Sequence, residues 1–217
     1  MITHKQLKSR EEWLEARRHS IGGSDAAAIV GASPYKTNIA LWEEKTGRTV
    51  SADISDKEAV KYGVSAEKYL RELFALDYPK MKVFYQPNNF WTNTEYPFAH
   101  CSLDGWLEDE RGRFGVLEIK TSTIQGAAMK AKWDQRIPEN YYIQVLHYLL
   151  VTGAEFAILK AKLIYHIEHE EPFAMIRHYR IEREEVKDDL LFLEEAEREF
   201  ARHMENDTPP ALTLPEI

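Results

Sequence analysis

The chain has 217 residues, of which 44% are hydrophobic, and a formal net charge of −8. This length and apolar content are enough to bury one substantial core, so we expect a single domain. A lone cysteine, Cys101, excludes a disulfide framework and any four-thiolate metal centre within the chain. The charged segment 1–18 lacks the apolar run of a signal peptide, and no stretch approaches the roughly 20 apolar residues of a membrane span. We therefore expect a soluble cytoplasmic protein.

The N-terminal part of the chain, residues 1–80, is predicted to be mainly helical. Ser9 followed by Glu12 is typical of a capping box, so a helix is expected to follow Ser9. The segment 22–25 begins a second helix, which Gly31 ends. Two further helices are expected at residues 39–45 and about 56–76.

The central part, residues 81–181, is predicted to form a sheet and its covering helices. Six strands bounded by Pro, Asn or Gly are expected at residues 82–86, 90–92, 98–107, 114–121, 156–164 and 173–181. Helices are expected at about 125–135 and at 139–152, where Gly153 follows. With the N-terminal helices and a C-terminal helix over 182–207, this order predicts one α+β domain over residues 1–217.

The negative charge of the chain is concentrated in that C-terminal helix. Residues 182–207 include 11 acidic and 4 basic side chains, a net charge of −7, which leaves −1 for the rest of the chain. The spacing of its apolar residues predicts one buried face, with the carboxylates on the opposite face (Val186, Leu190, Leu193, Phe200). Binding to nucleic acid depends on local contacts of basic side chains with phosphates, so an acidic outer helix does not exclude it.

An acidic residue at a turn precedes an apolar strand that carries two charges. Asp104-Gly105 is followed by Glu118 and Lys120 within the segment Gly115-Val116-Leu117-Glu118-Ile119-Lys120. Residues two apart on a strand point to one face. Burying an isolated ion costs several kcal/mol, so such charges persist when they pair or bind a metal. A solvated Glu–Lys pair on an ordinary strand is the alternative interpretation.

The residue types at this position suit a hard divalent cation. Asp104 and Glu118 offer anionic oxygens, and the backbone carbonyl of Ile119 adds a neutral one, which favours Mg²⁺ or Mn²⁺. Such a metal polarises a phosphodiester, lowers the pKa of an attacking water and stabilises the leaving oxygen. Lys120 would orient or deprotonate that water, or neutralise charge on the phosphate. The chemistry indicated is metal-assisted hydrolysis of a phosphodiester.

A second group of polar residues lies near the N-terminus. Arg17 is followed by Gly22-Gly23-Ser24-Asp25, which places an arginine near a hydroxyl and the free N–H groups of a helix start. These groups together suit a phosphate. The same residues also fit a capped helix that binds no ligand.

Five motifs follow one another between residues 13 and 153. They are Trp13-x-x-x-Arg17 with Gly22-Gly23-Ser24-Asp25, Gly63-x-x-x-Glu67, Ser102-x-Asp104-Gly105, Glu118-x-Lys120, and Ile137-Pro138 leading to Tyr142-x-Gln144-Val145-x-His147-Tyr148-Leu149. In this order they resemble the lambda exonuclease family, in particular its phage-type viral recombinase branch, within the PD-(D/E)xK nuclease superfamily. The resemblance implies a restriction-endonuclease-like core, in which a central mixed β-sheet is flanked by helices, with N-terminal helices and a long C-terminal helix.

The resemblance also implies roles for individual residues. Asp104 and Glu118 would hold two Mg²⁺ ions, which Mn²⁺ would be able to replace, and Lys120 would serve the attacking water. Glu67 would complete the acidic cluster and Gln144 would support the active site from its helix. The 5′-phosphate of a strand end would bind to three residues: Arg17, Ser24 and Ser102. On a regular strand, Ser102 would share a face with Asp104.

By the same resemblance, the protein would digest one strand of linear double-stranded DNA from its 5′ end and leave a 3′ single strand for recombination. It would act as a homotrimeric ring with a phage single-strand annealing protein, in the cytoplasm of a bacterial host that carries the phage or prophage. Leu103 stands where the superfamily has a nominal proline, which is not a ligand. No basic cluster is assigned to the downstream duplex, for which the candidates are Lys36, Lys130, Lys132 and Arg136.

Two other functions fit the same motifs. The fold also supports structure-specific endonucleases, although Arg17, Ser24 and Ser102 favour recognition of an end. A non-catalytic adaptor that binds DNA ends for an annealing recombinase would not need the complete set of Asp104, Glu118 and Lys120. Seven other residues are expected to pack or to be polar at a strand end: Trp13, Trp42, Trp91, Trp106, Trp133, His166 and His169.

Overall fold

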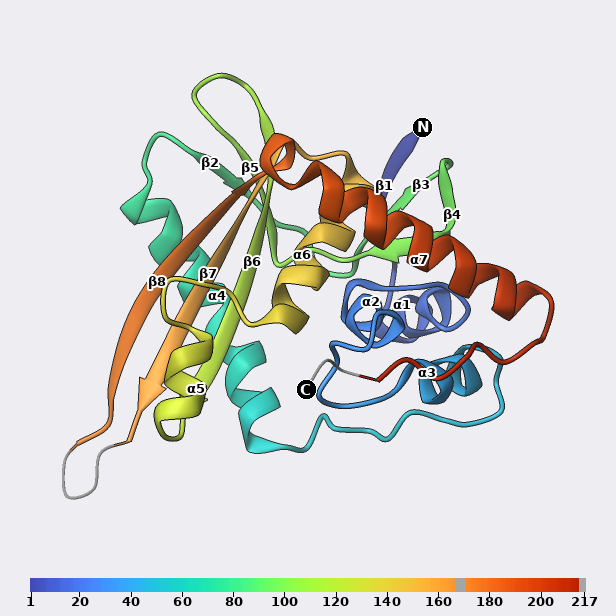
Figure 1. Ribbon diagram of the computed structural model, residues 1–217. Coiled ribbons are helices and arrows are strands. Elements are labelled where there is room, and N and C mark those ends of the chain that lie inside the picture. Colours follow the sequence, from blue (N-terminus) through green and yellow to red (C-terminus); the bar gives the residue numbers. More distant parts are fainter. Residues whose placement is uncertain (167–170, 215–217) are drawn as a thin grey trace.

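The computed structural model describes residues 1–166 and 171–214, and the strands within them form two sheets (Figure 1). The five-stranded sheet has the order β2 (Lys82–Phe84), β5 (Gly105–Glu108), β6 (Phe114–Ile124), β7 (Phe156–Tyr165) and β8 (Phe173–Glu182). Its strands β6 and β7 are parallel and the other neighbours are antiparallel. A three-stranded antiparallel sheet has the order β1 (Ile2–Gln6), β3 (Asn89–Asn93) and β4 (Tyr96–Cys101). The expected mixed α+β fold is confirmed.

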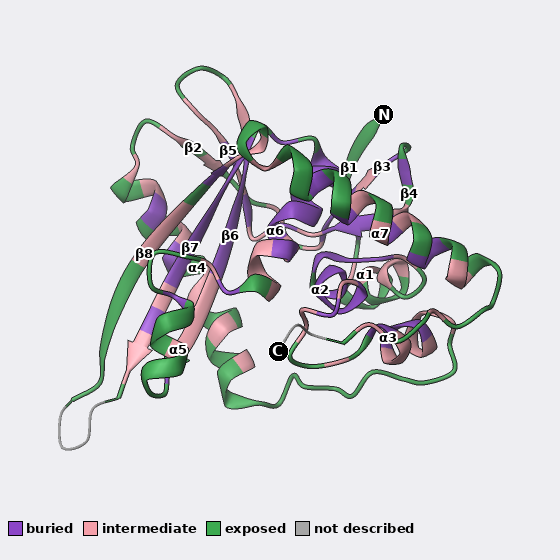
Figure 2. Ribbon diagram, in the orientation of Figure 1, coloured by how far each residue is buried: buried purple, intermediate pink, exposed green. Residues whose placement is uncertain are grey.

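Helices cover both faces of the parallel pair β6–β7. Helix α6 (Glu139–Thr152) packs on the face that carries Val116 and Leu159, while α4 (Glu58–Asp77) packs on the face that carries Leu117 and Ile158. The first half of each strand is largely buried and mostly apolar on both faces, since neither face meets water there, and Figure 2 shows this part in purple. Helix α6 ends at Gly153, whose left-handed backbone (φ +65°) suits glycine.

The N-terminal helices form a second small core beside the sheet. Helices α2 (Gly23–Ile29) and α3 (Asn38–Lys45) pack against the long helix α7 (Lys187–Glu205), while α1 (Arg10–Arg17), which precedes them, has no buried residue (Figure 1). Leu41 and Trp42 of α3 meet Phe200 of α7 in this core. A short helix α5 (Ala127–Lys132) follows β6, and a 3₁₀ turn, Arg183–Val186, leads into α7. No helix in the described part of the chain is long and apolar enough to cross a membrane.

The predicted strand over residues 98–107 is wrong, because the chain changes sheet within it. Strand β4 ends at Cys101 in one sheet, and β5 begins at Gly105 in the other. The side chain of Asn89 bridges this break, since its Oδ1 accepts from the N–H of Leu103 at 2.8 Å and its Nδ2 donates to the carbonyl of Leu103 at 2.9 Å. The amide thereby replaces the strand neighbour that the backbone of Leu103 lacks.

Two other expectations need correction. Strand β1 was not predicted, because all five of its residues are exposed and show no buried alternation. In α7 one carboxylate faces inward: Glu197 is 1% exposed, and its Oε1 lies 2.7 Å from Nδ1 of His147 on α6. A buried acid persists there because it is paired.

The sequence suggested structural rather than functional roles for the tryptophans and for two histidines. Trp42, Trp91 and Trp133 are buried, as expected for packing residues. His166 is exposed just after β7, and His169 lies outside the described residues.

Candidate active site

A cavity of about 420 Å³ lies where the chain passes from β4 to β5, next to β6. Every residue that the sequence assigned to catalysis, metal binding or phosphate binding lines it: Arg17, Ser24, Glu67, Ser102, Asp104, Glu118, Ile119, Lys120 and Gln144. Helices α1, α2, α4 and α6 contribute side chains from around the sheet. Residues more than 120 positions apart in the sequence therefore meet in one place.

Glu118 is the most buried carboxylate of this cavity, with an exposed fraction of 2%. Its Oε1 accepts hydrogen bonds from Lys120 Nζ at 2.6 Å and from Gln144 Nε2 at 3.0 Å. Its Oε2 is buried and has no hydrogen-bond partner in the described part of the chain. Asp104 is held by the N–H of Ile119, which donates to its Oδ2 at 2.8 Å. One free carboxylate oxygen is thus aimed into a site already rich in negative charge.

Burial and the charge of Asp104 raise the pKa of the two other carboxyl groups of the cavity. Burial and then the charge of Asp104 raise the pKa of Glu118 to about 8. Burial and then Asp104 also raise the pKa of Glu67 to about 7, and burial raises the pKa of Asp104. For Lys120, burial acts to lower the pKa, but the charges of Glu118 and Asp104 outweigh it and raise the pKa above its usual value. Three clustered acids face two cations, Lys120 and Arg71 of α4, so one negative charge remains that a divalent cation would neutralise.

The donor set fits a hard cation that keeps much of its water. Within residues 1–166 and 171–214, no three Asp, Glu, His or Cys side chains converge as a complete metal cage. Mg²⁺ is commonly bound through one or two carboxylates, with water and substrate phosphate completing its octahedron. Asp104 and Glu118, with the orphaned Oε2 of Glu118, match that mode.

Arg71 of α4 is a member of the site that the sequence did not reveal. Its Nη1 donates to the carbonyl of Asp104 at 2.5 Å, and its guanidinium lies 3.6 Å from the ring centre of Tyr85. Tyr85 itself lines the cavity. The arginine therefore fixes the backbone of Asp104 at the break between β4 and β5, where no sheet neighbour would hold it.

Two of the residues assigned to the phosphate, Arg17 and Ser102, contact Trp13 of α1. The guanidinium of Arg17 lies 4.0 Å from the centre of the Trp13 ring, whose Nε1 donates to Ser102 Oγ at 2.8 Å. Burial lowers the pKa of Arg17. The sequence suggested that Ser102 and Asp104 share a regular strand, and this is wrong. Both residues instead line the cavity from the break after β4.

A buried ion pair between Asp25 and Lys45 stabilises the segment that carries Arg17 and Ser24. Lys45 Nζ lies 2.6 Å from Asp25 Oδ2 and also donates to the carbonyls of Ser20 at 2.7 Å and Arg17 at 3.3 Å. Asp25 Oδ2 accepts from the N–H of Gly22 at 3.0 Å. The pair ties the end of α1 to the start of α2, and so sets the spacing between Arg17 and Ser24.

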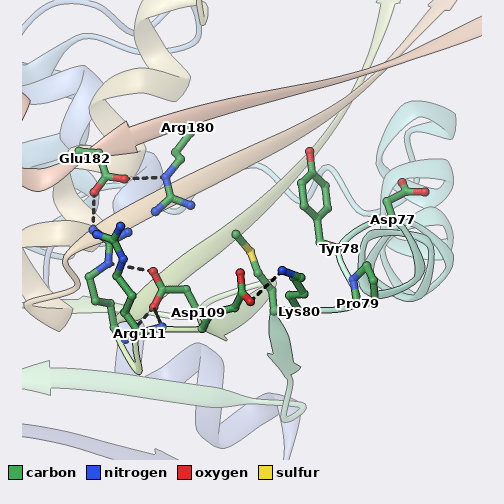
Figure 3. Close-up of a pocket in the computed structure, with 11 residues that line it drawn as sticks. Asp77, Tyr78, Pro79, Lys80, Asp109, Arg111, Arg180 and Glu182 are labelled. Carbon is green, nitrogen blue, oxygen red and sulfur yellow. Dashed lines mark hydrogen bonds and ion pairs between the residues drawn. The ribbon is translucent and has the colours of Figure 1, made fainter.

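A second cavity, of about 720 Å³, lies away from these residues, between the end of α4 and the turn that joins β5 to β6 (Figure 3). Most of its charged side chains form ion pairs with one another. The pairs are Lys80 with Glu110 at 3.0 Å, Arg113 with Asp109 at 2.8 Å, and Arg180 with Glu182 at 2.6 Å. It is larger than the cavity around Glu118, but its charges are already neutralised, so the smaller one is the candidate active site.

The basic residues suggested for a DNA track do not line the candidate active site. Lys130 and Lys132 lie on α5, and Arg136 Nε donates to the carbonyl of Ala131 at 3.2 Å. Lys36 forms an ion pair with Glu44. Their part in binding DNA stays a prediction.

This fold and site define a class of protein. The fold is that of alkaline exonucleases: the structure matches LHK-Exo from Laribacter hongkongensis with a TM-score of 0.65 and 17% identity, over 91% of this chain and 93% of that one. LHK-Exo in complex with dAMP matches similarly, with a TM-score of 0.64 and 18% identity over the same shares. A phage-related exonuclease from Haemophilus somnus 129PT matches with a TM-score of 0.55 and 13% identity, over 89% and 98% of the two chains.

The sequence comparison identifies the family. Residues 12–155 match the model of the YqaJ-like viral recombinase domain, and the chain belongs to that family. Protein YqaJ of Bacillus subtilis (strain 168) is 37% identical over 148 residues. The match covers 68% of this chain and 44% of YqaJ, so the chain spans less than half the length of that relative. The predicted membership of a viral recombinase family is confirmed, and the alkaline exonuclease fold is consistent with the predicted PD-(D/E)xK relationship.

Proposed function

We propose that the protein is a Mg²⁺-dependent 5′-to-3′ exonuclease that digests one strand of linear double-stranded DNA. The observation that carries this proposal is that one cavity holds both a carboxylate cluster with excess negative charge and a separate group of side chains whose chemistry suits a phosphate. The cluster supports metal-assisted hydrolysis, and the second group supports recognition of a strand end. The family and the exonuclease fold support the same class of reaction.

The carboxylates would hold the catalytic cations. Asp104, Glu118 and the carbonyl of Ile119 are the proposed ligands of two Mg²⁺ ions, for which Mn²⁺ would substitute, and Glu67 adds negative charge from α4. Bound there, the metal would polarise the phosphodiester and lower the pKa of the attacking water. Gln144 holds Glu118 in place through the bond to its Oε1.

Lys120 acts as a cation beside the reacting groups. It keeps its proton, since the neighbouring Glu118 and Asp104 raise its pKa despite burial. A protonated lysine donates hydrogen bonds but accepts none. Its role is therefore to orient the attacking water and to offset the charge that develops on the phosphate.

The phosphate-binding group would determine where cleavage occurs. Arg17, Ser24 and Ser102 offer a guanidinium and two hydroxyls on the cavity wall next to Asp104. Arginine binds phosphate through two parallel hydrogen bonds, which fixes orientation as well as charge. A terminal 5′-phosphate bound there would place the first internucleotide bond near the carboxylates.

The wider setting extends this proposal. The product would be a 3′ single strand for phage recombination, passed to a phage single-strand annealing protein. The active form would be a homotrimeric ring around the duplex, built from single nuclease domains over residues 1–217, in the cytoplasm of the bacterial host. Acidic outer helices such as α7 are compatible with a ring whose channel is less acidic.

Digestion of end-labelled DNA tests the function directly. A linear duplex labelled at its 5′ or 3′ ends is incubated with Mg²⁺ beside a closed circular duplex, with Asp104→Ala as the control. We expect loss of the 5′-labelled strand from its end, an intact circle and no hydrolysis by Asp104→Ala. A cut circle would replace the proposal with an endonuclease, and DNA that is bound but not hydrolysed would replace it with an end-binding adaptor.

A further inference from the structure

Tyr148 of α6 lines the same cavity as the phosphate-binding residues and was given no role above. Its side chain is 5% exposed, its ring belongs to the main core, and its hydroxyl contacts Gln144, another residue of the cavity lining. The ring packs against the start of α2. A Cβ atom on Gly23 would lie 2.3 Å from a carbon of the Tyr148 ring, closer than real contacts allow. The missing side chain of Gly23 therefore leaves the space that the Tyr148 ring occupies.

The hydrogen bonds of Gln144 show which way the proton of the Tyr148 hydroxyl is free to point. Nε2 of Gln144 lies 3.0 Å from Glu118 Oε1 and 2.6 Å from the Tyr148 hydroxyl. Oε1 of Glu118 already accepts from the protonated Lys120 and so acts as an acceptor, which means that the amide nitrogen of Gln144, rather than its oxygen, faces it. The same nitrogen then donates to the phenol oxygen.

That arrangement leaves the phenol proton available. The hydroxyl of Tyr148 accepts from Gln144, and within the described residues its own proton is given no acceptor. A buried hydroxyl proton without an acceptor is unusual, because buried polar groups are nearly always satisfied. Since Tyr148 lines the cavity, a bound ligand is the natural acceptor.

Tyr148 interacts electrostatically with both the carboxylates and the arginine of the site. Burial, and then the negative charges of Glu118 and Asp104, raise the pKa of Tyr148, so the phenol keeps its proton. Burial lowers the pKa of Arg17, and Tyr148 is among the groups close enough to act on it. The Tyr148 side chain therefore shares one cavity with the guanidinium and the carboxylates and interacts electrostatically with both.

We propose that the Tyr148 hydroxyl donates a hydrogen bond to an oxygen of the terminal 5′-phosphate, beside Arg17 and Ser24. This inference rests on the proposed function and adds a residue that determines specificity. It also gives Gln144 a second task, because that amide orients the hydroxyl toward the phosphate while it holds Glu118. Binding of a phosphate would then affect the position of Glu118 through the side chain of Gln144.

The test compares two hairpin duplexes that differ only in having a 5′-phosphate or a 5′-hydroxyl. Their affinities are measured by fluorescence anisotropy in EDTA, so that no hydrolysis occurs, for the wild type and for Tyr148→Phe. A hydrogen bond to a charged group is strong, so we expect the preference for the phosphorylated end to fall about tenfold or more in Tyr148→Phe. Single-turnover digestion in Mg²⁺ should show the same loss in the ratio of rates.

The matched control is Tyr142→Phe, which removes a hydroxyl from the same helix. The Tyr142 hydroxyl donates to Asp189 Oδ2 at 2.5 Å and does not line the cavity. Tyr142→Phe should keep the full preference for the phosphorylated end. Each ratio is measured within one protein preparation, so a partial loss of folded protein cancels.

The outcomes separate this inference from the proposed function. If the wild type prefers the phosphorylated end and Tyr148→Phe keeps that preference, the inference about Tyr148 is wrong while the exonuclease proposal stands. Equal slowing of both substrates by Tyr148→Phe has the same meaning, since it shows a structural role through Gln144 alone. A wild type that does not distinguish the two ends overturns the phosphate pocket and Tyr148 with it.

Discussion

Lys120 Nζ lies 2.6 Å from Oε1 of Glu118, and both side chains project from the same face of β6. The lysine neutralises one carboxylate of a cluster that also contains Asp104 and Glu67. The remaining repulsion is a property of the protein without metal, and it should appear as a dependence of stability on pH and on divalent cations.

Without divalent cations, stability should fall as the pH rises from about 4.5 to about 8. Burial and Asp104 raise the pKa of Glu118 from 4.5 to about 8, so the folded protein holds this proton more tightly than the unfolded chain does. The stabilisation is complete below the unfolded pKa and is lost as the pH passes through the folded one. Urea denaturation in EDTA across this range measures it.

The control for this pH dependence is Glu118→Gln, which keeps the shape of the side chain and removes the titrating group. It should make the fall in stability smaller and leave the part that comes from the raised pKa of Glu67, and Mg²⁺ should stabilise the wild type at the upper end of the range but not this variant. If stability in EDTA rose between about pH 5 and pH 8, the clustered-carboxylate interpretation would fail.

Replacement of Asp104 or Lys120 by Ala should abolish hydrolysis and leave the fold intact. Asp104 is a proposed metal ligand, and Lys120 is the cation placed beside the reacting phosphate. Loss of one preorganised electrostatic contact to a transition state costs about a hundredfold or more in rate. Single-turnover digestion gives the rate and circular dichroism gives the fold, and activity close to wild type in either folded variant would contradict the assignment.

Arg17→Ala should selectively reduce the preference for 5′-phosphorylated ends. The guanidinium is held over the ring of Trp13, at 4.0 Å from its centre, so the fork geometry is fixed before substrate binds. Arg17→Lys should recover only part of the preference, because an ammonium lacks the bidentate fork. Rates on phosphorylated and unphosphorylated duplexes are compared for each protein, and equal slowing of both would show that Arg17 is not part of a phosphate pocket.

The meeting of the proposed catalytic residues in one cavity was predictable from the sequence because the group is local. Glu118 and Lys120 lie two residues apart on a strand, where the alternation of side chains puts them on one face. Asp104 lies just before β5, which is the antiparallel neighbour of β6. The order of motifs then allowed the resemblance to supply Glu67 and Gln144, which no local pattern would have singled out.

The supporting contacts were not predictable because each one joins distant elements. Asp25 pairs with Lys45 from a different helix, and His147 pairs with Glu197 about 50 residues later. Taken alone, each of these residues looks like an ordinary polar position on a helix. The break at residues 102–104 was hidden for a similar reason, since the side chain that stabilises it, Asn89, lies on another strand.

The ion pair between Asp25 and Lys45, next to the proposed phosphate-binding residues, provides a further test of the site. Burial alone would raise the pKa of Asp25, but the charge of Lys45 and the bond from Gly22 hold it below the usual range. Lys45→Met would leave that carboxylate buried and unpaired, which costs about 3 to 5 kcal/mol of unfolding free energy. Urea denaturation near neutral pH measures the loss.

Lys36→Met is the matched control, because Lys36 pairs with Glu44 at a more exposed position and should contribute about 1 kcal/mol or less. The double variant Lys45→Met with Asp25→Asn should recover part of the loss, since no unpaired charge remains. Lys45 also holds the carbonyls of Arg17 and Ser20, so the double variant should still discriminate poorly between phosphorylated and unphosphorylated ends. Full discrimination with restored stability would show that the ion pair serves folding alone.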